Sequence, residues 1–169
     1  MTELSEGAVA ARVPSIVEER LAVVGRREPV TVSPGTSLAD CIAAIQRTGT
    51  GDSVFVTDRD GRLLGVLTER DIFGRLVGTD VAEIDLDQPV ESLMTTKPHH
   101  LHLEETVHDA IGLMQTGRYR NVPLLDDEDH LVGVVRPQEI LKYLAEAFPE
   151  ELLNLPPRPH QTMHRAEGG

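Results

Sequence analysis

The chain has 169 residues, 28 of them acidic and 16 basic, and its formal net charge is −12. An acidic surface repels nucleic-acid backbones and anionic membranes, and only 3% of the residues are aromatic, so we expect neither nucleic acid nor a membrane as a partner. We also expect no membrane span, no secretion signal and, with Cys41 as the single cysteine, no internal disulfide, which favours a cytoplasmic location.

Taken in chain order, the predicted elements occur twice. Pro29 aligns with Pro98, and further along Asp58 aligns with Asp126 at an offset that is one residue shorter. A single deletion in a loop explains the shift, and such self-similarity indicates two copies of one structural unit. The predicted organisation is an N-terminal segment with a short helix (1–28), a first repeat (29–86), a second repeat (87–148) and a Pro-rich C-terminal tail (149–169).

Both copies have the predicted element order β-α-β-β-α. Helical stripes follow the spacing i, i+3, i+4, i+7, and Asp-rich turns separate the second and third strands. The first strand is expected to lie parallel to its neighbour after a right-handed crossover. Because one copy of about 50 residues buries little surface alone, the sequence predicts an α/β (α+β) fold with two repeats packed sheet to sheet about a pseudo-two-fold axis.

A candidate binding site follows the third strand of the first copy, in the segment Gly65-Val66-Leu67-Thr68-Glu69-Arg70-Asp71. Thr68 and Asp71 place a hydroxyl and a carboxylate beside the free N–H groups of a helix start, and this set of groups suits a sugar diol. The same spacing is also a capping box, which needs no ligand. The segment alone leaves both interpretations open.

The doublet with Gly-hydrophobic-hydrophobic-Thr-x-x-Asp resembles the cystathionine-β-synthase (CBS) domain family over about residues 29–148. This resemblance implies a cleft between paired repeats that binds AMP, ADP, ATP or S-adenosylmethionine. It implies that Thr68 and Asp71 contact the ribose. It further implies that adenine lies against the first and second strands, at Val30, Thr31, Val54 and Val56.

The resemblance also implies a phosphate contact from a basic residue that precedes the hydrophobic-Pro strand. Arg120 has this position in Gly117-Arg118-Tyr119-Arg120-Asn121-Val122-Pro123, and Arg118 lies close to it. A guanidinium group can donate two hydrogen bonds to one phosphate. The alternative is that these arginines are solvated or pair with nearby acids.

The two copies differ at the residues that matter for binding. Arg136 stands where the first copy has Thr68, and Glu139 stands where it has Asp71. The first copy in turn lacks the basic residue that the second has at Arg120. We therefore predict one good nucleotide site and a second, impaired or empty site at Arg136 and Glu139. Alternatively, Arg136 extends into the cleft and contacts phosphate.

The other candidate chemistry is weaker. His100 and His102 share one face of a strand, but most metal sites have three or four ligands, so no metal is predicted. No nucleophile–base pair or phosphate-cradling loop supports an enzyme. We expect a regulatory, ligand-sensing module without a catalytic cofactor, whose regulatory ligand is an adenosine nucleotide. It is expected to form a homodimer and to signal to a separate partner protein. The alternatives are a ligand-free dimerisation scaffold and, third, a metal-assisted enzyme.

Overall fold

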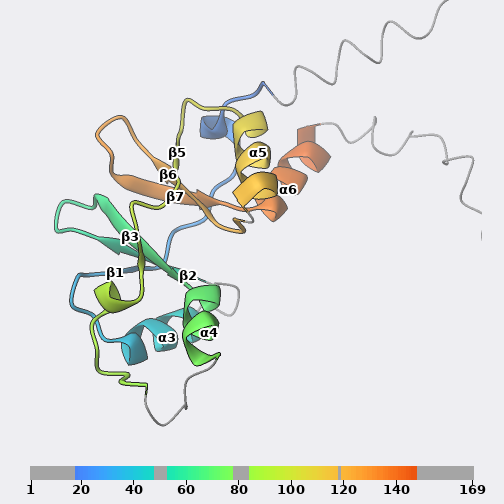
Figure 1. Cartoon of the computed structure of the whole chain (residues 1–169). Helices are drawn as coiled ribbons and strands as arrows, with labels where there is room; N and C mark the ends of the chain where they lie inside the picture. Colours follow the sequence, from blue (N-terminus) through green and yellow to red (C-terminus); the bar gives the residue numbers. More distant parts are fainter. Residues whose placement is uncertain (1–17, 48–52, 78–83, 118, 148–169) are drawn as a thin grey trace, which may run out of the picture.

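The computed structural model describes residues 18–47, 53–77, 84–117 and 119–147, which form two similar halves (Figure 1). The predicted tail lies outside these residues. Of the leading helix predicted at 15–24, residues 18–24 are described, and they contain only a short 3-10 helix. The first half contains β1 (Thr31–Val32), α3 (Leu38–Arg47), β2 (Ser53–Thr57), β3 (Leu63–Thr68), α4 (Glu69–Leu76), η3 (Val90–Ser92) and β4 (Thr95–Thr96). The second half contains η1 (Leu21–Val23), β5 (Leu101–His102), α5 (Val107–Gly117), β6 (Val122–Leu125), β7 (Leu131–Val135) and α6 (Pro137–Ala147).

Each half has a mixed sheet covered by helices, as the element order predicts. The sheet of the first half has the order β1-β2-β3-β4, and that of the second half has the order β5-β6-β7. The strand before each crossover helix is parallel to the strand after it, and the hairpin strands are antiparallel. The α/β prediction with a β-α-β-β-α order is confirmed. Strand β4, which pairs with β3, was not predicted.

The two halves exchange N-terminal segments. Strand β4 and η3, which lie at the start of the predicted second repeat, pack on the first half, where Val90 is fully buried. In the same way, Leu21 lies in the core of the second half with 0% exposure. Arg27 extends the second sheet, because it exchanges two backbone hydrogen bonds of 2.9 Å with Val134. Packing therefore crosses the sequence boundaries predicted at residues 28 and 86.

Equivalent residues of the two repeats touch each other. Asn121 Nδ2 donates a 3.0 Å hydrogen bond to Ser53 Oγ, and Arg62 forms a backbone bridge with His130. Each of these pairs joins a residue to its own counterpart in the other repeat. Only residues beside a symmetry axis can do so, and the predicted pseudo-two-fold axis therefore passes between the β2–β3 and β6–β7 hairpins.

The predicted stripe of α3 forms the core of the first half. Leu38, Cys41 and Ile45 are buried against β2 and β3. Burial raises the pKa of the Cys41 thiol to about 11, so this thiol stays protonated at neutral pH. Among the described helices, none has both the length and the apolar character needed to cross a bilayer.

Candidate functional site: a cleft between the two repeats

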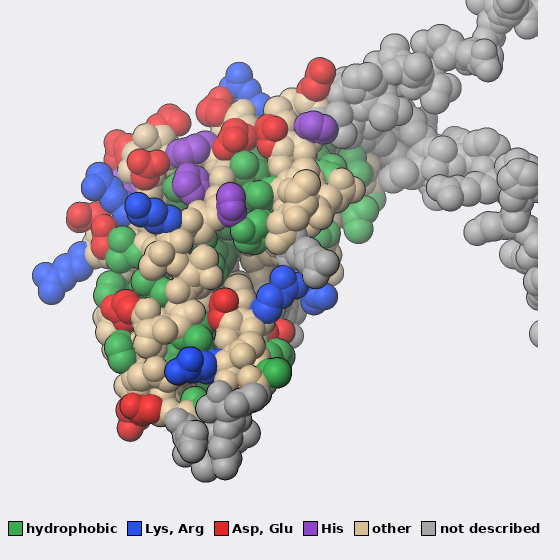
Figure 2. Space-filling model, viewed as in Figure 1, with side chains coloured by type: hydrophobic (Ala, Val, Ile, Leu, Met, Phe, Trp, Pro, Cys, Tyr) green, Lys and Arg blue, Asp and Glu red, His purple; other side chains and the backbone are tan. Residues whose placement is uncertain are grey.

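A cleft of about 860 Å³ opens between the two halves. Its walls come from the start of α4, the connection from β4 to β5, and the segment that joins α5 to β6. Figure 2 shows this hollow with Lys and Arg side chains beside it. Its volume lies within the range of sites that hold a nucleotide-sized ligand, roughly 300–1,000 Å³.

Thr68 and Asp71 line this cleft and also cap their own helix. Asp71 Oδ2 accepts hydrogen bonds from Thr68 N at 2.8 Å and from Thr68 Oγ1 at 2.7 Å, and Asp71 N donates to Thr68 Oγ1 at 3.3 Å. Both bonds to the carboxylate use Oδ2. Within the described part of the chain, Oδ1 of Asp71 has no partner, so one carboxylate oxygen is left to accept a hydrogen bond from a ligand.

The start of α5 shows that this cap does not by itself define a binding site. Thr106 and Asp109 make the same three hydrogen bonds, at 2.9, 2.7 and 3.3 Å, but they do not line the cleft. The bonds from Thr106 lower the pKa of the Asp109 carboxyl below its usual value. The two interpretations of Thr68 and Asp71 are therefore compatible, because these residues form a cap that faces an open cleft.

The segment between α5 and β6 places a basic and an aromatic side chain at the cleft. Arg120 and Tyr119 both line it, whereas Arg118 lies outside the described residues. The Tyr119 ring lies against Gly117, where a Cβ atom would approach ring atoms to 2.0 Å, so any larger residue at this position would displace the ring. Tyr119 also contacts His99, with ring centroids 5.4 Å apart.

None of the four predicted adenine contacts lines this cleft, and adenine binding itself stays a prediction. Val54 and Val56 are fully buried in the core of the first half, so neither faces the cleft. Side chains alternate along a strand, and it is therefore Phe55, between them, that lines the cleft. Val30 and Thr31 do not line it either.

The sheet topology explains why Val30 does not line the cleft. The segment that approaches Thr68 comes from the start of the second repeat, because β4 pairs with β3 of the first half. The residues in reach are consequently Lys97 and His99, where His99 is the counterpart of Val30. No pattern in the sequence indicates that Lys97 lines the cleft. In contrast, the alternation of side chains along β2 is sufficient to place Phe55 on the face opposite the core.

Ion pairs occupy the second helix start, at Arg136 and Glu139. Glu139 Oε2 accepts a 3.0 Å hydrogen bond from Arg136 N and lies 3.4 Å from Arg136 Nε, while Oε1 lies 3.6 Å from Arg27 Nε. Both side chains of the Arg136–Glu139 pair are only 14% exposed. In contrast to Asp71, Glu139 therefore has both carboxylate oxygens engaged by arginines.

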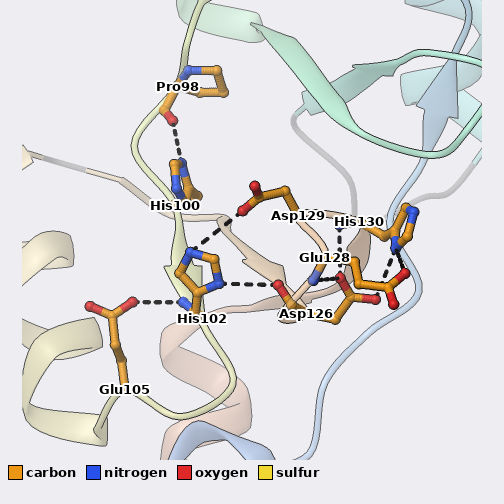
Figure 3. Close-up of polar contacts among 8 residues, drawn as sticks. All are labelled: Pro98, His100, His102, Glu105, Asp126, Glu128, Asp129 and His130. Carbon is orange, nitrogen blue, oxygen red and sulfur yellow. Dashed lines mark hydrogen bonds and ion pairs between the residues drawn. The ribbon is translucent and has the colours of Figure 1, made fainter.

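His100, His102 and His130 are hydrogen-bonded within the protein (Figure 3). His100 Nδ1 lies 3.2 Å from the carbonyl of Pro98, and His102 Nδ1 lies 3.2 Å from the carbonyl of Asp126. A carbonyl oxygen only accepts, so each Nδ1 carries a proton and is not a free metal ligand. Across the residues that the structure describes, no group of three or more His, Cys, Asp or Glu side chains is arranged to hold a metal ion.

Comparison with known proteins identifies the family. Residues 17–78 and 90–146 each match the CBS domain, so the chain belongs to the CBS domain family. A CBS-domain-containing protein from Agrobacterium tumefaciens is 30% identical, and its structure is similar at a TM-score of 0.60 over 69% of this chain and 90% of that protein.

Two further solved structures share the fold. A CBS domain protein from Pyrobaculum aerophilum, solved with AMP, is 24% identical at a TM-score of 0.63, covering 76% of this chain and 99% of that one. A CBS domain pair solved with 5′-methylthioadenosine and S-adenosyl-L-methionine is 22% identical at a TM-score of 0.61, covering 76% and 98%.

The chain spans only part of several curated relatives. It matches 66% of an uncharacterized protein from Methanopyrus kandleri at 29% identity, and 22% of the inosine-5′-monophosphate dehydrogenase of Yersinia pestis at 33% identity. The corresponding shares of this chain are 76% and 68%.

Proposed function

We propose that this chain is a regulatory module that binds one adenosine nucleotide per chain in the cleft at Thr68 and Asp71. The observation that carries the proposal is the carboxylate of Asp71, which lines a nucleotide-sized cleft and keeps one oxygen unpaired among the described residues. A ribose has two hydroxyl groups that can donate to such a carboxylate. Family members of the same fold have been solved with AMP or with S-adenosyl-L-methionine, which supports an adenosine-containing ligand.

Isothermal titration calorimetry with AMP, ATP and S-adenosylmethionine tests this proposal. Wild-type protein is expected to bind at least one of them with one site per chain. Asp71→Ala should weaken that binding by about tenfold or more, because it removes a hydrogen-bonded carboxylate. Asp109→Ala is the matched control, since it removes an identical cap away from the cleft and should leave the affinity within about twofold. Equal losses in the two variants would show that Asp71 acts only through its helix.

We further propose that the module forms a homodimer through α4 and α6 and performs no catalysis. Phe73 on α4 and Leu141 on α6 are counterparts in the two repeats and are 59% and 66% exposed. Exposed apolar side chains at equivalent positions suit an interface that both repeats share. Leu141 does not line the cleft, so Leu141→Lys should shift the protein to monomer on a sizing column without weakening nucleotide binding. A wild-type protein that elutes as a monomer would contradict the dimer.

Ligand binding would regulate a separate partner by favouring one arrangement of the two halves. A ligand shifts such an equilibrium only by its difference in affinity for the two arrangements. The alternative function, a dimerisation scaffold without a ligand, is favoured by the ion pairs that occupy Glu139. It predicts a dimer whose melting temperature does not change with any adenosine compound.

A further inference from the structure

Basic residues outnumber acidic residues in the lining of the cleft, although acidic residues predominate in the chain as a whole. Acidic residues outnumber basic ones 28 to 16 in the whole sequence, yet the residues that line the cleft include three basic side chains, Arg70, Lys97 and Arg120, and two acidic ones, Glu69 and Asp71. Over the described ranges, none of the three cations forms an ion pair with a carboxylate. An anionic ligand that enters the cleft would therefore find cations whose charge is not already neutralised.

Lys97 has a backbone conformation that its sequence disfavours. Its φ is 48°, in the left-handed region that residues other than glycine uncommonly adopt. It also precedes Pro98, and the residue before a proline is driven toward extended conformations by the proline ring.

The surrounding structure imposes this conformation on Lys97. On one side, Thr96 is paired with Gly65 in the sheet of the first half. On the other side, Pro98 is buried and its carbonyl lies 3.2 Å from His100 Nδ1. Strained residues that persist in this way are concentrated at binding sites, and Lys97 borders the cleft.

On the basis of the nucleotide site proposed above, we infer that Lys97 is a specificity-determining residue that contacts ligand phosphates together with Arg120, and that affinity rises with the number of phosphates. ATP and ADP carry more negative charge than AMP, and adenosine carries none. S-adenosylmethionine carries a sulfonium, an ammonium and a carboxylate, so its net charge is positive. A cleft in which Arg70, Lys97 and Arg120 outnumber the two acidic residues would repel it. The cleft is therefore assigned to adenosine phosphates and not to S-adenosyl compounds.

Calorimetric titration of four proteins with ATP, AMP, adenosine and S-adenosylmethionine tests the inference. The proteins are wild type, Lys97→Gln, Lys97→Arg and Arg75→Gln, the last being a control on α4 outside the cleft. Lys97→Gln should lower ATP affinity by about tenfold and leave adenosine affinity within about twofold, because only the phosphates contact the charge. Lys97→Arg should restore most of the ATP affinity, and Arg75→Gln should match wild type.

The outcomes separate this inference from the proposed function. If wild-type protein binds adenosine compounds and Lys97→Gln weakens ATP and adenosine equally, or neither, Lys97 does not contact phosphate and only this inference fails. Tighter binding of S-adenosylmethionine than of ATP by wild type would likewise overturn the phosphate preference alone. If wild type binds none of the four ligands, both proposals fail. A loss of ATP affinity that increases at low salt and disappears at high salt would support a direct charge contact.

Discussion

The starts of α4 and α6 occupy equivalent positions in the two halves but have opposite surroundings. At α4, Asp71 caps its helix through one carboxylate oxygen and borders an open cleft. At α6, both oxygens of Glu139 are engaged, by Arg136 from the same helix start and by Arg27 from the exchanged N-terminal segment. Glu139 is one methylene longer than Asp71, and Arg136 replaces the threonine. The start of α6 is therefore held by ion pairs, whereas the start of α4 has a capping box that faces the cleft. The comparison shows how a duplicated unit can keep its fold at both positions while the two helix starts are held by different polar contacts.

The largest expected loss of stability comes from substitutions in the exchanged segments, because each of these segments fills part of the core of the other half. Leu21→Ala should lower the free energy of unfolding by about 3 kcal/mol, since it leaves a cavity in the core of the second half. Guanidinium denaturation followed by circular dichroism would measure this change. Val23→Ala, at a neighbouring side chain that is 58% exposed, should change it by less than about 0.5 kcal/mol. If the second half unfolded in a separate, earlier transition in Leu21→Ala, the two halves would be independent folding units.

A smaller loss of stability is expected from a substitution at the start of α6, where Glu139 is ion-paired. Glu139→Ala should destabilise the protein by about 1–2 kcal/mol, because it removes the carboxylate that accepts a hydrogen bond from the N–H of Arg136 and pairs with the side chains of Arg136 and Arg27, with the Arg27 pair discounted for its exposure. Urea denaturation of the variant beside Glu146→Ala would measure this. Glu146 pairs with Lys142 at an exposed position, and its loss should cost less than about 0.5 kcal/mol. Equal costs would show that the junction at α6 has no special structural role.

The smallest expected effect is a change in the pH dependence of stability. It tests the capping box at α5, which lies away from the cleft. Thr106→Val removes a hydrogen bond that lowers the pKa of Asp109, so that pKa should rise toward its ordinary value in an NMR carboxyl titration. A lowered folded-state pKa adds stability above the unfolded-state pKa of about 4, and this stability is lost as pH falls through the folded-state value. Wild type should therefore lose more stability than Thr106→Val between pH 6 and pH 3, by less than about 1 kcal/mol after screening. An identical pH dependence in both proteins would contradict the cap at α5.

The sequence was sufficient for features that depend on local pattern. Two helical stripes were visible as spacing: Leu38, Cys41, Ile42 and Ile45, and Val107, Ala110, Ile111 and Met114. Five of these eight side chains are buried, and Ile42, Ile111 and Met114 are half-buried. The repeat also revealed the doublet and the Thr68–Asp71 segment. Val54 and Val56 were predicted beside the ligand, yet they lie in the core, and the alternation along β2 places Phe55 at the cleft instead.

The remaining features depend on contacts between distant segments. Strand β4 has only two residues, too few for a periodic signal, and its pairing brings Lys97 to the cleft. The backbone of Lys97 contradicts the local preference of a residue before proline. The contact of Arg27 with Glu139 joins residues from opposite ends of the fold, and no spacing rule connects them.

The exchange of segments makes each half depend on the other for its interior. Residues near the start of one repeat complete the core of the other half, as Leu21 does for the second half and Val90 for the first. Either half cut out at the predicted repeat boundaries would therefore leave part of its apolar interior open to water, and the two halves are expected to be stable only when joined.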